Sequence, residues 1–180
     1  MASALSACVD LSINLDVVDA NNGMGTTTIS MDRQFYDMSQ QSSGSGFCDA
    51  DGKLTLTETA ATCVTTQSGT FDELFSGSDP SEPTPRIATL DNGQVKVTFP
   101  TGSLVEQASE AGSDPETLAQ MASYFENHFF SISVSGGQVV DTNMTIAEDG
   151  QSASLTVPIL DMIKGEVDLP DEAYAVLQLN

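Results

Sequence analysis

The strongest constraint on the fold is a change of hydrophobic period within residues 113–156. Ser113 and Glu116 form a capping box, and Pro115 fits the first turn, so this sequence predicts the start of a helix. Apolar residues then recur at steps of three or four along one helical face: Leu118, Met121, Ala122, Phe125 and Phe129. A helix with one apolar stripe must bury it, so we expect this helix to pack on another element.

The residues that follow change to a period of two, which is typical of a strand with one solvent-facing side. Apolar residues alternate with serines over residues 130–135. Gly136-Gly137 predicts a turn, residues 139–146 a returning strand, and residues 153–159 another alternating strand. We therefore expect the helix to lie on a three-stranded antiparallel meander.

The N-terminal part of the chain adds more strands. Residues 9–17 alternate strictly between apolar and polar, and Asn21-Asn22-Gly23 predicts a hairpin that returns through residues 25–32. Residues 33–41 predict a short helix. Together these patterns predict an α+β fold in two layers, with an antiparallel β-sheet of hairpins and a meander packed against one main helix.

The rest of the chain predicts further short elements and one loop. Residues 91–93 (Asp-Asn-Gly) predict another hairpin, residues 158–164 a helical turn, and residues 173–179 a last strand. The three prolines of residues 76–85 predict a flexible surface loop. Because the chain has 180 residues, we expect one α+β domain over residues 9–180, large enough to bury a core without a metal.

The charge of the chain narrows the possible partners. It carries 26 Asp and Glu against 5 Lys and Arg, for a net charge of −21. Such a protein repels phosphate backbones, so we expect no nucleic-acid partner. The acidity serves solubility, in a salty habitat for instance, or binds cations; the sequence leaves both open.

Residues 5–8 (Leu-Ser-Ala-Cys) resemble the lipobox of bacterial lipoproteins, in which the cysteine sulfur is lipidated. We expect residues 1–8 to be a residual signal peptide and Cys8 to anchor the protein to a membrane. Residues 1–7 have neither a basic nor an apolar region, so a functional signal needs preceding residues. No apolar run approaches the roughly 20 residues of a membrane-spanning helix, so attachment would depend on Cys8. The alternative is a cytosolic acidic globular protein of unknown activity.

The other two cysteines predict a disulfide. If Cys8 carries lipid, Cys48 and Cys63 remain as a pair. A bridge closing a loop of about 15 residues contributes about 3 kcal/mol in the chain-entropy model. The cysteine spacing and the distant His128 do not match a zinc site.

Residues 47–58 allow two interpretations. Asp49, Asp51 and Glu58 stand at places three, five and twelve of a calcium-binding EF-hand loop, but Phe47 occupies the first place, where a carboxylate ligand is normal. The flanking residues have strand patterns instead of helical ones. A hairpin is the first interpretation and a calcium-dependent structural or binding module the second.

We find no catalytic constellation and expect no enzyme and no cofactor. Any Ser-His-Asp site must use His128, whose place at the end of the predicted helix fits a dipole partner better. Tyr124 lies off the apolar stripe of that helix. It either packs at the sheet edge or lines a groove suited to an acyl chain or a peptide.

The lipobox with its alternating strand and hairpin, residues 135–143 (SGGQVVDTN) and the strand at residues 150–158 resemble the LppM-type family of bacterial envelope lipoproteins. This resemblance implies an exposed, membrane-anchored α+β domain without established enzymatic activity. The expected function is therefore a lipid-anchored extracytoplasmic binding or structural module of the cell envelope. Its expected partners are the membrane, through lipid on Cys8, and a protein or lipid ligand.

Overall fold

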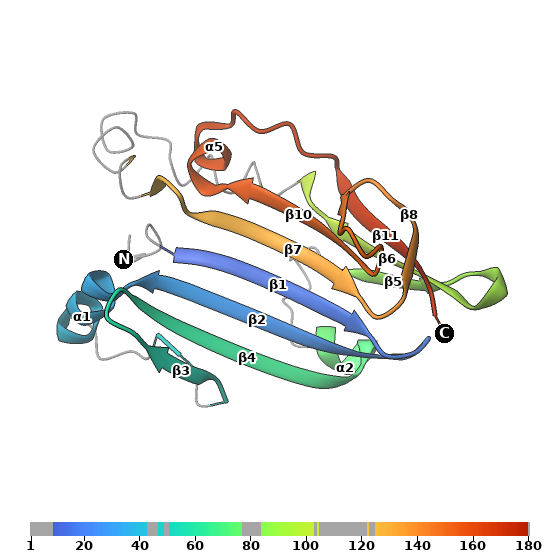
Figure 1. Ribbon diagram of the computed structural model, residues 1–180, viewed down its shortest axis with the longest axis horizontal. Helices are drawn as coiled ribbons and strands as arrows, with labels where there is room; N and C mark the ends of the chain where they lie inside the picture. The colour runs from blue at the N-terminus through green and yellow to red at the C-terminus, as the bar shows by residue number, and fades with distance from the viewer. Residues whose placement is uncertain are drawn as a thin grey trace.

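Strands dominate the computed structural model, which describes residues 9–42, 47–48, 51–76, 84–102, 104, 122 and 125–179 (Figure 1). In chain order the elements are β1 (Val9–Val17), β2 (Asn22–Asp32), α1 (Arg33–Ser42), β3 (Lys53–Leu56), β4 (Ala60–Thr70), α2 (Phe71–Phe75), β5 (Arg86–Thr89), the 3-10 turn η1 (Asp91–Gly93), β6 (Gln94–Pro100), β7 (Phe129–Ser135), β8 (Gln138–Thr142), β9 (Thr145–Ile146), β10 (Ser152–Pro158), α5 (Ile159–Lys164) and β11 (Glu172–Gln178).

The strands form two sheets, where the sequence predicted one. The larger sheet has seven strands in the order β3-β4-β2-β1-β7-β10-β9, and the smaller has four in the order β5-β6-β11-β8. The larger sheet is mixed, because β1 and β7 run parallel while its other neighbouring pairs are antiparallel. The antiparallel hairpins of the predicted fold class are therefore confirmed. The prediction was wrong in expecting one sheet, where the structure has two, and in expecting only antiparallel pairs, where β1 and β7 are parallel.

Several local predictions are confirmed. β1 and β2 form the predicted hairpin, and β5 and β6 pair across residues 91–93, where Asn92 and Gly93 both have positive φ. α5 ends at Gly165 in the left-handed conformation, as the glycine after a predicted helical turn indicates. β3 and β4 form a hairpin as well, in agreement with the first interpretation of residues 47–58, and its turn lies between Leu56 and Ala60.

The predicted meander is wrong. β7 pairs with β10, whereas β8 crosses to the smaller sheet and pairs with β11. The connection depends on Gly136, which has a φ of 112° and packs against the end of β1; a Cβ there would lie 2.7 Å from the backbone nitrogen of Val17. Gly136-Gly137 therefore moves the chain from one sheet to the other instead of closing a hairpin.

The main core lies between the sheets. Its buried residues come from both, including Leu15 and Val17 of β1, Val134 of β7, and Val97 and Leu177 of the smaller sheet. We call the face of the larger sheet that carries these residues its inner face. Figure 1 shows the smaller sheet at the end of the larger one where β1 terminates, so the first half of β1 lies away from this core.

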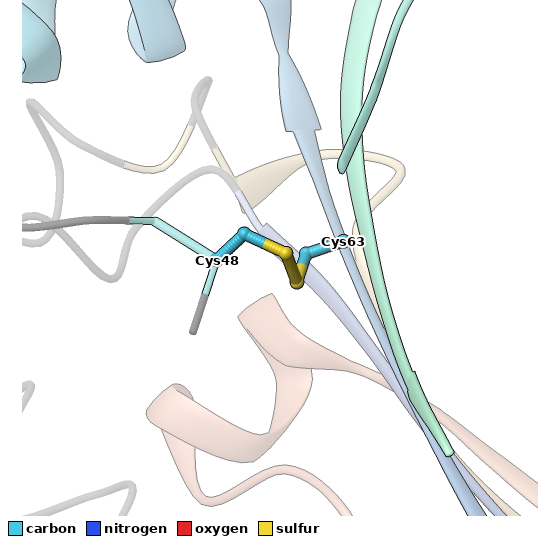
Figure 2. The surroundings of a disulfide bond; sticks show 2 residues. All are labelled: Cys48 and Cys63. Atoms are coloured by element: carbon cyan, nitrogen blue, oxygen red, sulfur yellow. A yellow bond between two sulfur atoms is a disulfide. The ribbon is translucent and has the colours of Figure 1, made fainter. Parts of the chain in front are cut away.

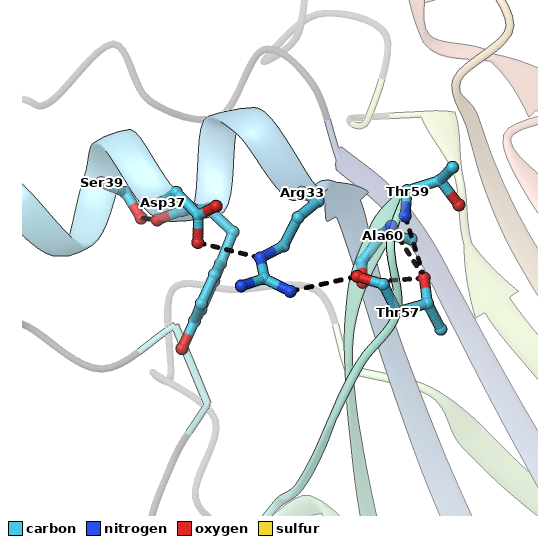
Figure 3. A network of polar contacts seen from close by, with 7 residues as sticks. Arg33, Asp37, Ser39, Thr57, Thr59 and Ala60 are labelled. Atoms are coloured by element: carbon cyan, nitrogen blue, oxygen red, sulfur yellow. Dashed lines mark hydrogen bonds and ion pairs between the residues drawn. The ribbon is translucent and has the colours of Figure 1, made fainter.

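α1 is fixed to the β3–β4 hairpin by one of the few basic residues of the chain. Arg33 contacts Asp37 at 2.9 Å within α1, and its Nη1 donates to the backbone oxygen of Thr57 at 3.1 Å (Figure 3). The backbone N–H of Arg33 also donates to the oxygen of Thr59 at 2.9 Å. These bonds hold α1 beside the turn that joins β3 and β4.

The predicted main helix falls mostly outside the described residues, as does most of the loop predicted at residues 76–85. Near its predicted end, Phe125 is buried and packs with Phe35, Ile159, Leu160 and Ile163. Phe129, predicted on the buried helical stripe, instead begins β7 and is 42% exposed. The period therefore changes from helix to strand earlier than predicted, because pairing with β10 begins at Phe129 itself.

Candidate functional site

The inner face of the larger sheet carries an apolar pocket near the start of β1. Cys63 of β4 stands opposite Ile29 of β2, Ile29 opposite Leu11 of β1, and Leu11 opposite Phe130 of β7. Directly paired residues point to the same face of a sheet, so these side chains form one row across four strands. The pocket floor consists of Ile29, Leu11 and Phe130 from this row, with Val9 and Met31 from the next.

Two walls stand on this floor. α5 contributes Ile159 and Met162 on the side of β7 and β10, and Phe47 contributes the other wall. The cavity has a volume of about 410 Å³, within the range of small-molecule sites. Every residue that lines it in the described part of the chain is apolar. The pocket can therefore hold an apolar group but offers it no described polar partner.

The predicted disulfide is confirmed and adjoins the pocket. Cys48 and Cys63 are bonded, with their Cα atoms 5.4 Å apart. Figure 2 shows the bridge projecting from β4 toward the side of the sheet where α5 lies. Gly52 packs against it so closely that a Cβ there would lie 2.6 Å from the sulfur of Cys48 and 2.8 Å from that of Cys63. The bridge thus fixes Phe47, the residue before Cys48, beside the sheet.

A histidine and an aspartate join the elements at one end of the pocket. Asp10, next to Val9, accepts a hydrogen bond of 2.8 Å from the backbone N–H of Phe129. The same carboxylate oxygen lies 3.4 Å from Nδ1 of His128, whose side chain is only 13% exposed. The oxygen of His128 in turn accepts from the N–H of Ile159 at 3.0 Å. His128, predicted as a helix-end residue, therefore links the starts of β1, β7 and α5.

The other residues singled out in the sequence either lie outside the described residues or do not line this pocket. Cys8, Asp49 and Tyr124 lie outside the described residues. Asp51 and Glu58 are exposed, beyond opposite ends of β3. Within the described ranges, no group of three or more His, Cys, Asp or Glu side chains could hold a metal ion. Calcium binding through Asp49, Asp51 and Glu58 stays a prediction.

The pocket at the start of β1 was not predicted from the sequence, although the burial of some of its residues was. Val9, Leu11 and Phe130 belong to the apolar sides of predicted strands. Their convergence with Phe47 and α5 could not be predicted, because β1 and β7 are distant in sequence and pair in parallel.

A second cavity lies at the opposite end of the β1–β2 hairpin. It has a volume of about 570 Å³ and is lined by polar and apolar residues, among them Asn21, Thr70, Asp72, Phe75 and Thr89. We favour the first pocket as the site because its described lining is uniformly apolar. An apolar hollow on a strongly acidic protein indicates a binding site more clearly than a hollow of mixed polarity does.

Comparison with known proteins gives a match at the level of structure. No helix of the described chain is long and apolar enough to cross a membrane. Neither a protein-family model nor a curated protein matches the sequence. The structure is similar to the NMR structure of the folded domain of LppM from Mycobacterium tuberculosis, with a TM-score of 0.52 and 11% identity over 96% of this chain and 91% of that one. The resemblance to the LppM type is thus confirmed in the fold: this chain has the fold of the LppM domain.

Proposed function

We propose that the protein is a lipid-anchored, extracytoplasmic module of the bacterial envelope that binds an apolar chain, such as the acyl chain of a lipid, in the pocket between the larger sheet and α5. The observation that carries this proposal is the apolar lining of a 410 Å³ cavity at the surface of an otherwise acidic chain. The proposal involves binding alone, without a catalytic step.

The chemistry of the lining favours an acyl chain over a peptide. A peptide buried there would leave backbone N–H and C=O groups without described partners, which costs several kcal/mol. An alkyl chain has no such groups and gains about 0.8 kcal/mol for each CH₂ buried. Because the net charge of −21 repels anions, a lipid with a neutral head group fits best.

The location of the pocket supports an envelope role. Val9, a floor residue, directly follows Cys8, so lipid on Cys8 would hold the pocket close to the membrane surface. The Cys48–Cys63 disulfide supports an oxidising compartment, where such bonds persist. The LppM-like fold supports the same assignment.

Filling the pocket tests the binding proposal. Replacing Ile29→Trp places a larger side chain on the floor, so we expect it to abolish uptake of a neutral monoacylglycerol, measured by displacement of Nile red fluorescence. Ile146→Trp is the matched control, because Ile146 is 49% exposed on β9 and does not line the pocket. Equal uptake by the Ile29→Trp variant and the wild type would contradict binding in this pocket.

The anchor has its own test. Mass spectrometry of the protein isolated from its native host should show a mature N-terminus at Cys8 carrying diacylglycerol. An uncleaved and unmodified Cys8 would rule out lipid anchoring and leave a pocket-containing protein that is not held at a membrane.

A further inference from the structure

The structure points to a specific role for Phe47: we infer that it sets the longest apolar chain the pocket accepts, by closing the pocket at its β4 side. This inference rests on the proposed function and goes beyond it, because it names the residue that determines which lipids bind. Three features carry it: the position of Phe47 opposite α5, the contacts that hold it there, and the apolar surface that continues behind it.

Phe47 and α5 lie at opposite ends of the floor. The disulfide ties the chain at Cys48 to Cys63 on β4, whereas α5 directly follows β10 on the far side of β7. Three strand-to-strand steps separate β4 from β7, or roughly 14 Å at about 4.8 Å per step. A chain that enters beside α5 and crosses the strands therefore meets Phe47 at the end of its path.

Phe47 is held from two directions. Its ring packs edge-on against Tyr36 of α1, with the ring centroids 5.7 Å apart, and α1 is itself bonded to the β3–β4 turn through Arg33 (Figure 3). On its other side, Phe47 is covalently next to the bridge at Cys48, which packs against Gly52 (Figure 2). Such a wall keeps its place when a flexible chain presses on it, as a residue that discriminates chain length must.

The apolar inner face continues beyond Phe47. Leu54 of β3 stands opposite Cys63, and Leu56 stands opposite Ala61, so both leucines extend the floor rows by one more strand. Leu54 is 39% exposed. The β4 residues in between are covered, since Ala61 is 0% and Cys63 3% exposed and Gly52 packs on the bridge. Removing the Phe47 ring would therefore lengthen the apolar cavity toward the bridge by the volume of that ring. At the opposite wall, the space behind α5 is already occupied, because Phe125 packs with Ile159 there.

The test compares chain-length profiles. Neutral monoacylglycerols of increasing chain length, from octanoyl to stearoyl, are titrated against the folded protein and dissociation constants are measured by Nile red displacement. We expect affinity in the wild type to rise with length and then stop rising. In Phe47→Ala the rise should continue to longer chains, with a gain of tenfold or more for the longest. Phe129→Ala, which removes an exposed ring outside the pocket, should keep the wild-type profile.

A second variant addresses the bridge. Joint replacement of Cys48→Ser and Cys63→Ser leaves the ring but removes its covalent tether, so we expect a wild-type affinity for short chains and a weakened length limit. A Phe47→Ala profile with the wild-type limit, or with the same loss at every length, would overturn the inference while leaving the pocket as a binding site. Absence of binding by the wild type at every length would overturn the proposed function as well. Thermal melting of each variant confirms that the fold is retained.

Discussion

At the scale of single residues, a glycine in the connection between the two sheets and a glycine in β2 have opposite roles. Gly136 has a φ of 112° and lies against the backbone of Val17, so it needs both the freedom and the small size of glycine. For Gly25 in β2, no atom beyond its two chain neighbours lies within 4 Å of the place where a Cβ would stand. Only the first is required by the crossing between the sheets.

Alanine substitution should separate these roles. We expect Gly136→Ala to lower the free energy of unfolding by about 2–4 kcal/mol, because it combines an unfavourable φ with a backbone clash. Gly25→Ala, the matched control, should leave it unchanged or raise it by about 0.5–1 kcal/mol through the lower chain entropy of alanine. Urea unfolding measures both, and equal effects would show that the close approach to Val17 does not constrain the turn.

At the scale of elements, the sequence predicts strands well and their partners poorly. The alternating pattern of β1, β7 and β10 was readable because each has one apolar and one polar side. The same pattern cannot show which sheet a strand joins, and β8, which follows β7 in the chain, crosses to the smaller sheet. The pocket depends on those long-range pairings, so its floor residues could be predicted as buried but not as neighbours.

α2 was missed, although its start carries a readable signal. Thr70 caps the helix by accepting from the N–H of Glu73 at 3.3 Å, and the Glu73 carboxylate accepts from the N–H and the hydroxyl of Thr70 at 2.9 Å each. Thr and Glu three residues apart are the pattern of a capping box. A helix of only five residues is too short to show a hydrophobic period, so the cap was its one sequence signal.

This cap predicts a pH dependence. Hydrogen bonds from the backbone N–H of Thr70, and then from its hydroxyl, lower the pKa of Glu73 from its ordinary value of 4.5. A lowered pKa contributes stability above the pKa of the unfolded chain and loses it as the pH falls through the folded pKa. The difference in melting temperature between the wild type and Glu73→Gln should therefore be largest near neutral pH and shrink below pH 4.5.

Asp72→Asn is the matched control for this cap. It removes one charge from the same helical turn without touching the bonds to Thr70. If both variants lose stability in parallel across the pH range, net charge explains the effect and the capping box does not.

At the scale of the whole molecule, charge is the dominant unbalanced feature. With 26 acidic and 5 basic residues, self-repulsion opposes the compact state, and the described ion pairs, such as Arg33 with Asp37, are too few to offset it. The sequence alone left two explanations of this acidity open, general solubility and calcium binding. Salt separates them because screening depends on ionic strength and not on the identity of the cation.

We expect sodium chloride to raise the melting temperature steadily as the Debye length falls from about 10 Å at 0.1 M to about 3 Å at 1 M. At one fixed ionic strength, calcium and magnesium should then give the same melting temperature, since neither has a described cluster of ligands. A specific calcium site would instead add about 2.7 kcal/mol at a hundredfold excess over its Kd. If calcium alone stabilises the protein and Asp51→Asn with Glu58→Gln removes that gain, the loop at residues 47–58 binds calcium and screening is not the whole explanation of the acidity.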